Sequence, residues 1–217
     1  MIVRYYRICI VLLFEQGDDA VADKKNPLTI EDGVVINCNY KAREAIIPAG
    51  VRAIGKEAFC NCDLMSVVIP KGVIEIRNDA FASCIRLPIL DIPNSVTKIG
   101  SGAFSQCYSL NDVEIPKCVT KIEEKTFFGC AIKKIAIPKG VTYIGSEAFA
   151  SCKSLTDIAI PASVAEIDTH AFYGCTSLME IRFGGTKAQW AAIKKDDDWY
   201  SGILAELVHC TNGYADL

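Results

Sequence analysis

An Ile-Pro pair that recurs at a nearly constant interval constrains this chain more than any other feature of its sequence. The prolines of the six pairs are Pro48, Pro70, Pro93, Pro116, Pro138 and Pro161. The interval is therefore 22 or 23 residues, and Phe183-Gly184 continues it once more without the proline. A repeat of this length predicts a solenoid, in which each unit stacks on the previous one.

Each repeat follows the template L-x-x-I-x-I-P-x-x-V-x-x-I-G-x-x-A-F-x-x-C-x-x, which is clearest between Leu87 and Cys107. The last two apolar residues before the proline are two positions apart, as in a strand with one buried face, and the proline ends the strand because it cannot donate a ladder hydrogen bond. The glycine position is expected to allow a tight bend, and the Ala-Phe pair fits a helical or 3₁₀ turn. One repeat cannot form a core alone, so we expect stacked repeats to share one beneath a single parallel sheet.

The template also predicts the core residues and the places where the repeat length changes. The side chains expected to be buried are Val67, Ile69, Leu90, Ile92, Val113, Ile115, Ile135, Ile137, Ile158 and Ile160, with Phe59, Phe81, Phe104, Phe127, Phe149 and Phe172. The two 22-residue steps each lack one residue after the cysteine, between Cys62 and Leu64 and between Cys130 and Ile132. Such deletions are tolerated in turns.

The pattern I-P-x-x-V-x-x-I-G-x-x-A-F-x-x-C resembles the BspA-like, or treponemal, subclass of leucine-rich repeats, and the resemblance covers Ala42 to Gly184. It implies a leucine-rich-repeat solenoid with a parallel β-sheet on one face and short, 3₁₀ or helical turns on the other. Members of this family are commonly surface or secreted proteins of bacteria and of some protists. Where a role is assigned, it is adhesion or protein recognition, so the resemblance favours a secreted or cell-surface location and a non-enzymatic scaffold.

Both ends of an open solenoid need caps. We expect a leader or signal segment at 1–26, an N-terminal hairpin cap at 27–41, repeats at 42–184 and a C-terminal helical cap at 185–217. In the C-terminal cap, Thr186 and Gln189 match a capping box that begins a helix extending to about Lys195. Trp190 and Trp199 are interpreted as plugs of the cap, and the alternative is a ligand platform.

The N-terminal segment has some features of a secretory signal. Arg4 and Arg7 precede the apolar run 8–14, and Ala20-Val21-Ala22 resembles a signal-peptidase site, although the run is short and acidic residues follow it. The alternative is a leader without a structure of its own or a wrongly assigned start codon.

Six of the eleven cysteines occupy one template position: Cys62, Cys84, Cys107, Cys130, Cys152 and Cys175. We interpret them as a ladder of buried thiols that donate weak hydrogen bonds to turn carbonyls. Disulfides between neighbouring coils are an alternative, because strand spacing falls within the Cα range of a disulfide. Metal binding is disfavoured, since a single-file ladder does not bring four ligands together. The other five cysteines, Cys9, Cys38, Cys60, Cys118 and Cys210, follow no pattern.

Other chemistry finds little support. The net charge is −3 without a basic stripe, so nucleic acid is not an expected partner, and no run of about 20 apolar residues predicts a membrane span. No phosphate-binding loop, dinucleotide fingerprint or zinc-protease motif is present, so we expect no enzyme, no cofactor and no metal. His170 and His209 are interpreted as a surface residue and a cap residue.

The outward side of the sheet is therefore the expected functional surface. Residues between the buried ones point outward and form two columns that vary in residue type, with more acidic than basic members. We expect a protein or another macromolecule to bind there, around Asp91, Asp112, Glu114, Asp157 and Glu180. The alternative is a purely structural array that spaces or displays something without a specific ligand.

Overall fold

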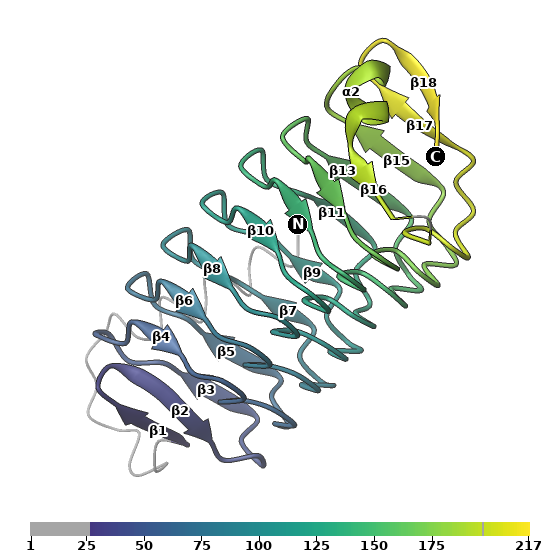
Figure 1. The fold of residues 1–217 in the computed structure, drawn as a ribbon. Coiled ribbons are helices and arrows are strands. Elements are labelled where there is room, and N and C mark those ends of the chain that lie inside the picture. Colours follow the sequence, from purple (N-terminus) through teal and green to yellow (C-terminus); the bar gives the residue numbers. More distant parts are fainter. Residues whose placement is uncertain (1–26, 197) are drawn as a thin grey trace, which may run out of the picture.

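The computed structural model describes residues 27–196 and 198–217, which form one elongated stack of coils (Figure 1). The expected leader, with its signal-like features, lies outside the described residues, and so does Cys9. The section boundaries expected from the sequence stay a prediction. Among the described residues, no helix is both long and apolar enough to cross a membrane.

The L-x-x-I-x-I segments form a first column of parallel strands, as predicted. Equivalent residues of neighbouring coils are paired, such as Ala45 with Val67 and Ile158 with Ile181. The strands of this column are β3 (Glu44–Ile46), β5 (Ser66–Val68), β7 (Ile89–Leu90), β9 (Asp112–Val113), β11 (Lys134–Ala136), β13 (Asp157–Ile160) and β15 (Glu180–Phe183). The column consists of three groups of paired strands, β3–β5, β7–β9 and β11–β13–β15, and within each group the same template position of neighbouring coils is paired.

A second column of short parallel strands differs from the single sheet that the sequence predicted. Its members, formed by the V-x-x-I segments, are β4 (Ala53–Ile54), β6 (Glu75–Ile76), β8 (Lys98–Ile99), β10 (Lys121–Ile122), β12 (Tyr143–Ile144) and β14 (Glu166–Ile167). Stacking of equal coils brings equivalent backbone groups together, so any extended segment can pair with its copy. Gly100, expected to permit a bend, has no positive φ. A Cβ there would lie 2.6 Å from the Asn78 backbone nitrogen, so this glycine permits close approach of two coils.

The phenylalanine-bearing side consists of hydrogen-bonded turns, and no helix forms there. Each coil has two residues with left-handed backbone in this turn, such as Glu57 (φ 56°) and Asn61 (φ 58°). Every second backbone N–H group of the turn donates to a carbonyl of the next coil, as from Phe59 to Ala80 at 2.8 Å. The N–H groups between them donate to carbonyls of their own coil, as from Cys62 to Phe59 at 3.1 Å. The backbone donors are thus satisfied without regular secondary structure.

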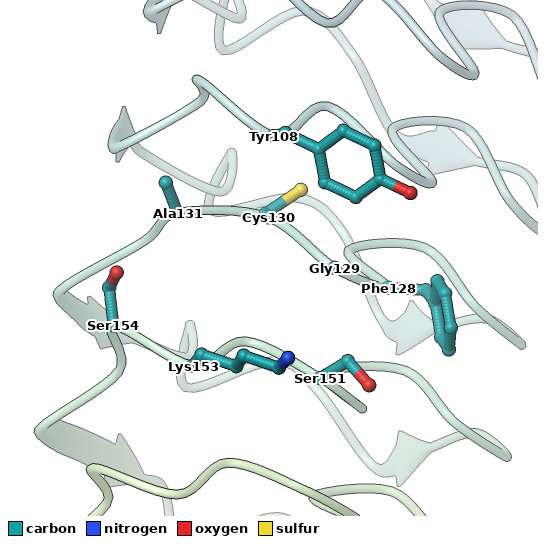
Figure 2. Close-up of a pocket in the computed structure, with 8 residues that line it drawn as sticks. All are labelled: Tyr108, Phe128, Gly129, Cys130, Ala131, Ser151, Lys153 and Ser154. Carbon is teal, nitrogen blue, oxygen red and sulfur yellow. The ribbon is translucent and has the colours of Figure 1, made fainter.

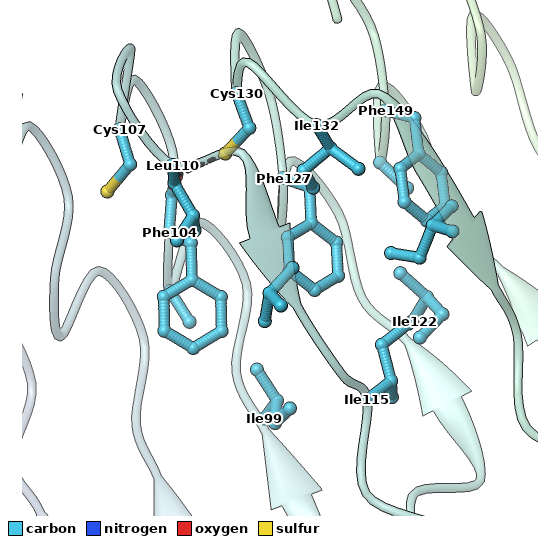
Figure 3. Close-up of a cluster of buried hydrophobic side chains, with 14 of the residues drawn as sticks. Ile99, Phe104, Cys107, Leu110, Ile115, Ile122, Phe127, Cys130, Ile132 and Phe149 are labelled. Carbon is cyan, nitrogen blue, oxygen red and sulfur yellow. Dashed lines mark hydrogen bonds between the residues drawn. The ribbon is translucent and has the colours of Figure 1, made fainter. Parts of the chain in front are cut away.

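The predicted core is confirmed. The six phenylalanines are fully buried, and their rings stack from coil to coil with centroids 4.7–5.8 Å apart. Figure 3 shows Phe104, Phe127 and Phe149 of this column. All the other side chains expected to be buried are buried except Val67, which is partly exposed against the core. Its strand partner is Ala45, whose small side chain covers it less than a larger residue would.

The N-terminal end of the stack is covered by a hairpin, as expected. Strands β1 (Leu28–Glu31) and β2 (Val34–Cys38) are antiparallel around a turn in which Asp32 and Gly33 have positive φ. Strand β2 also pairs in parallel with β4, so the hairpin closes the second strand column.

The C-terminal segment completes one further coil and then closes it. Helix α2 (Lys187–Ala192) has the predicted capping box, but it ends earlier than expected, because Ile193 is extended and β16 (Lys194–Lys195) pairs with β14. Trp199 takes the next place in the aromatic stack, edge-on to Phe172 at 5.8 Å. Strands β17 (Leu207–Cys210) and β18 (Gly213–Asp216) form a hairpin beside β15.

Candidate interaction face

We define the sheet face as the outward-pointing residues of the first strand column. The burial pattern of β3 illustrates it: Glu44 and Ile46 are exposed, and Ala45 between them is buried. In-register pairing repeats this pattern within β3–β5, β7–β9 and β11–β13–β15, so outward residues of paired strands are neighbours. These groups of strands follow one another along the stack, and the sheet face extends with them (Figure 1).

The five residues expected to bind a partner divide into two groups on this face. Asp91, Asp112 and Glu114 are exposed in adjacent coils near the middle of the stack. Asp157 and Glu180 lie in β13 and β15. Asp157 is buried, and Glu180 is half-buried.

Asp157 and Glu180 belong to an ion-pair cluster. Lys134 Nζ lies 2.8 Å from Asp157 Oδ2, and Arg182 Nη1 lies 2.8 Å from Asp157 Oδ1 and 3.2 Å from Glu180 Oε1. The Arg182 contact to Oδ1 is ionic, because its angle does not make a hydrogen bond. The hydrogen bond from Lys134, assisted by the charge of Arg182, lowers the pKa of the Asp157 carboxyl although burial opposes this.

The residue types at neighbouring strand positions indicate this cluster. The comparison of acidic with basic residues in the outward columns did not predict it. Lys134 stands directly beside Asp157 in the register, and Ala159 of β13 stands beside Arg182. Two cations therefore flank one carboxylate on adjacent strands. Opposite charges in neighbouring strands attract, so the side chains close over Asp157 and leave it only 8% exposed.

The N-terminal part of the sheet face carries exposed apolar side chains that the acidic prediction did not include. Ile46, Val68 and Ile89 are 46%, 39% and 36% exposed, and they occupy outward positions of β3, β5 and β7. Ile89 is paired in register with Asp112. This apolar group therefore borders the exposed carboxylates, and both groups together form a mixed surface.

The cysteine ladder is buried and free of disulfides, as predicted. Each ladder thiol from Cys84 to Cys175 donates a hydrogen bond, 3.0–3.2 Å long, to the carbonyl of a phenylalanine in the preceding coil. Burial raises the pKa of Cys107 and Cys175 to about 12, which disfavours the nucleophilic thiolate. In residues 27–196 and 198–217, no group of His, Cys, Asp and Glu is arranged to hold a metal ion.

The two tryptophans act as cap plugs. Trp190 and Trp199 are each 2% exposed, and their ring centroids are 5.7 Å apart. Trp190 Nε1 donates to the Asp216 carbonyl at 2.9 Å. His170 lies at one of the left-handed turn positions with φ 56°, and His209 packs against Tyr214 in the terminal hairpin.

Solved structures with the same fold come from several bacteria. A leucine-rich repeat protein of Eubacterium ventriosum matches at TM-score 0.69 and 19% identity over 88% of this chain and 55% of its own. A leucine-rich repeat protein of Bacteroides ovatus matches at TM-score 0.59 and 29% identity over 77% of this chain and 56% of its own. The pneumococcal vaccine antigen PcpA matches at TM-score 0.57 and 17% identity over 78% of this chain and 51% of its own. The present chain thus spans about half the length of each of these proteins.

No curated protein matches the sequence significantly. A family description does match: the BspA type leucine rich repeat region, in six copies, over residues 28–156 and 106–192. These matches include the cap hairpin, all the Ile-Pro repeats and helix α2, and they agree with the stacked coils of the structure. The chain belongs to the family of BspA-type leucine-rich-repeat proteins.

Proposed function

We propose that this chain is a non-enzymatic scaffold that binds a protein segment through the sheet face. The supporting observation is the mixed surface of exposed apolar residues next to the exposed carboxylates Asp91, Asp112 and Glu114. Contiguous apolar surface that stays exposed is typical of interaction sites, and nearby charges select the partner's sign. A segment with apolar side chains next to Lys or Arg therefore fits this surface.

The proposed patch is centred on the exposed group of carboxylates. Asp157 and Glu180 also belong to it, at its edge, because their charges are already paired with Lys134 and Arg182. A partner would have to displace these cations to reach Asp157, whereas the carboxylates of Asp112 and Glu114 stand exposed. We therefore expect Asp112 and Glu114 to contribute most of the binding free energy.

An array of synthetic peptides tests this proposal. Peptides that alternate Leu or Phe with Lys or Arg should capture the protein, and peptides with Asp or Glu in place of the cations should not. The variant Asp91→Asn/Asp112→Asn/Glu114→Gln should lose capture, since the attraction for basic side chains is gone.

A matched control removes three charges elsewhere. Asp198→Asn/Glu206→Gln/Asp216→Asn changes exposed residues of the C-terminal segment and should bind like wild type. Equal capture by the wild-type protein and the sheet-face variant would contradict the proposal. Absence of capture by any peptide would favour a spacer or display role.

A further inference from the structure

A recess of about 390 Å³ opens on the turn side of the stack, away from the sheet face (Figure 2). It lies at the second shortened turn, where Ala131 alone separates Cys130 from Ile132, whereas two residues fill this place in the coils before and after. The short turn forms the floor, and the longer turns at Tyr108 and Lys153 form the walls. The one-residue deletion thus leaves a hollow between the two longer turns that flank it.

The aromatic wall is held in place by its neighbour. Tyr108 is 57% exposed, and a Cβ at position 129 would lie only 3.2 Å from Cε1 of its ring. Gly129 therefore lets the ring rest on the next coil, and its φ of +72° is also one that favours glycine. This contact places the ring of Tyr108 at the edge of the recess.

The other lining groups are polar and available. Ser151, Ser154 and Lys153 contribute two hydroxyls and an ammonium group (Figure 2). In the described part of the chain, no carboxylate lies within ion-pairing distance of the Lys153 ammonium. The recess therefore presents one aromatic ring, hydroxyls and one unpaired cation.

The first shortened turn, between Cys62 and Leu64, carries a charged residue where the second shortened turn carries none. There Asp63 occupies the position of Ala131, and Tyr40, 62% exposed, precedes it as Tyr108 precedes Ala131. Arg86 of the following coil lies with Nη1 3.7 Å from Asp63 Oδ2. At the first turn the chain's own carboxylate meets the basic residue of the next coil. At the second turn that carboxylate is missing, and the cation of the following coil comes from the neighbouring position, because Lys153 is one residue after Cys152 whereas Arg86 is two residues after Cys84.

We propose that the recess at Ala131 binds a sugar residue that carries a carboxylate, such as a terminal uronic or sialic acid. The C–H groups of the sugar ring pack against the electron-rich face of Tyr108, and the serine hydroxyls hydrogen-bond to sugar hydroxyls. Lys153 pairs with the carboxylate, as Arg86 does with Asp63 at the first turn. The volume is near the lower end of the range of about 300–1,000 Å³ for small-molecule sites, so one or two sugar units fit.

Ligand-observed NMR titrations with three methyl glycosides test the site: a glucuronide, a sialoside and the neutral glucoside. At least one of the acidic glycosides should bind the full chain about tenfold more tightly than the neutral one, the usual size of a hydrogen bond to a charged group. Which acid binds identifies the source of the carboxylate. Equal affinities for all three glycosides, or no binding of either acid, would overturn the proposal.

Variants then assign the binding to the recess. Lys153→Met should weaken acid binding about tenfold, and Ala131→Asp should abolish it, because the new carboxylate copies Asp63 and pairs with Lys153. Arg86→Met, at the first turn, is the matched control and should bind like wild type. All three positions are on the surface, and an unchanged unfolding midpoint confirms that each variant folds. If Lys153→Met and Ala131→Asp bind as well as wild type, the sugar occupies another site and the proposal fails.

Discussion

The phenylalanine column and the outward columns of the sheet face pass through the same coils, yet they differ in what each coil contributes. The phenylalanine column repeats one residue type, and each inner ring, from Phe81 to Phe149, contacts a phenylalanine ring in the coil before and in the coil after it. The outward positions change from Ile89 to Asp112, and from Lys134 to Asp157, without altering the strand register. Repetition inside therefore supplies stability, and variation outside is free to supply recognition. Asp157 departs from this division, because it is outward by register and buried by its neighbours.

The largest difference between the interior and the exterior is expected in the rate at which their cysteine thiols are alkylated. The six ladder cysteines are buried, whereas Cys118 is exposed. Iodoacetamide at pH 8 should alkylate Cys118 in minutes. The ladder thiols should react at least about 10³-fold more slowly, since reaction requires unfolding of a domain stabilised by about 5 kcal/mol or more. Peptide mass spectrometry measures each rate, and unfolding without reductant should expose all six. Disulfide-linked peptides from adjacent coils would contradict this prediction.

Loss of one ring from the phenylalanine column should have the largest effect on folding. Phe104→Ala empties a fully buried site between Phe81 and Phe127 and should lower the free energy of unfolding by about 3–5 kcal/mol. Phe104→Leu keeps most of the volume and should cost clearly less. Urea unfolding followed by circular dichroism gives both values. A loss below about 1 kcal/mol for the alanine variant would show that the coils do not depend on the stack.

The interior was predictable because the sequence repeats it. The spacing of Phe104 from Phe81 and Phe127 defines the repeat, and stacking follows from the repeat alone. The left-handed turn positions were not predictable, because Glu57, Gly102 and His170 share one such position without sharing a residue type. Their backbone is imposed by hydrogen bonds to the next coil, which overrides local preference.

Side-chain arrangements on the surface were less predictable than the fold. The sequence placed Asp157 correctly in the outward column, but its burial depends on Lys134 and Arg182 closing over it from two neighbouring strands. The recess at Ala131 was visible in the sequence only as a missing residue. Its lining depends on how Tyr108 leans on Gly129, which requires the structure.

Neutralising Asp157 should separate it from the exposed carboxylates. Asp157→Asn removes the charge that holds Lys134 and Arg182 and should lower the free energy of unfolding by about 1–2 kcal/mol, a moderate value because both cations can return to water. Asp112→Asn, on an exposed side chain, should change it by less than about 0.5 kcal/mol. Equal effects of the two variants in urea titrations would contradict the distinction between paired and exposed carboxylates.

The difference in the free energy of unfolding between wild type and Asp157→Asn should depend on pH. Because the pKa of Asp157 is lower in the folded chain than its ordinary value of about 3.9, its contribution is present above that value and is lost as the pH falls through the folded-state pKa. The gap in stability between wild type and Asp157→Asn should therefore be constant from pH 7 to about 5 and shrink below about 4. Urea titrations at several pH values measure it, and a gap that widens in acid would contradict the sign.

The smallest effect is expected among the exposed carboxylates themselves. Continuing the register of Leu90 with Val113 by one residue places Asp91 beside Glu114, so two negative charges face each other on adjacent strands. Such pairs are unfavourable by about 0.2–1 kcal/mol and are screened by salt. Glu114→Gln should therefore raise the free energy of unfolding by a few tenths of a kcal/mol in low salt, and the gain should disappear at about 1 M NaCl, where the Debye length is about 3 Å. Glu206→Gln, in the C-terminal segment, serves as the comparison and should show no such salt-dependent gain. A stabilisation that persists in salt would have to come from packing. A loss of stability would mean that Glu114 makes a favourable contact in the free protein, and its place at the centre of the proposed binding patch would then rest on structure as much as on recognition.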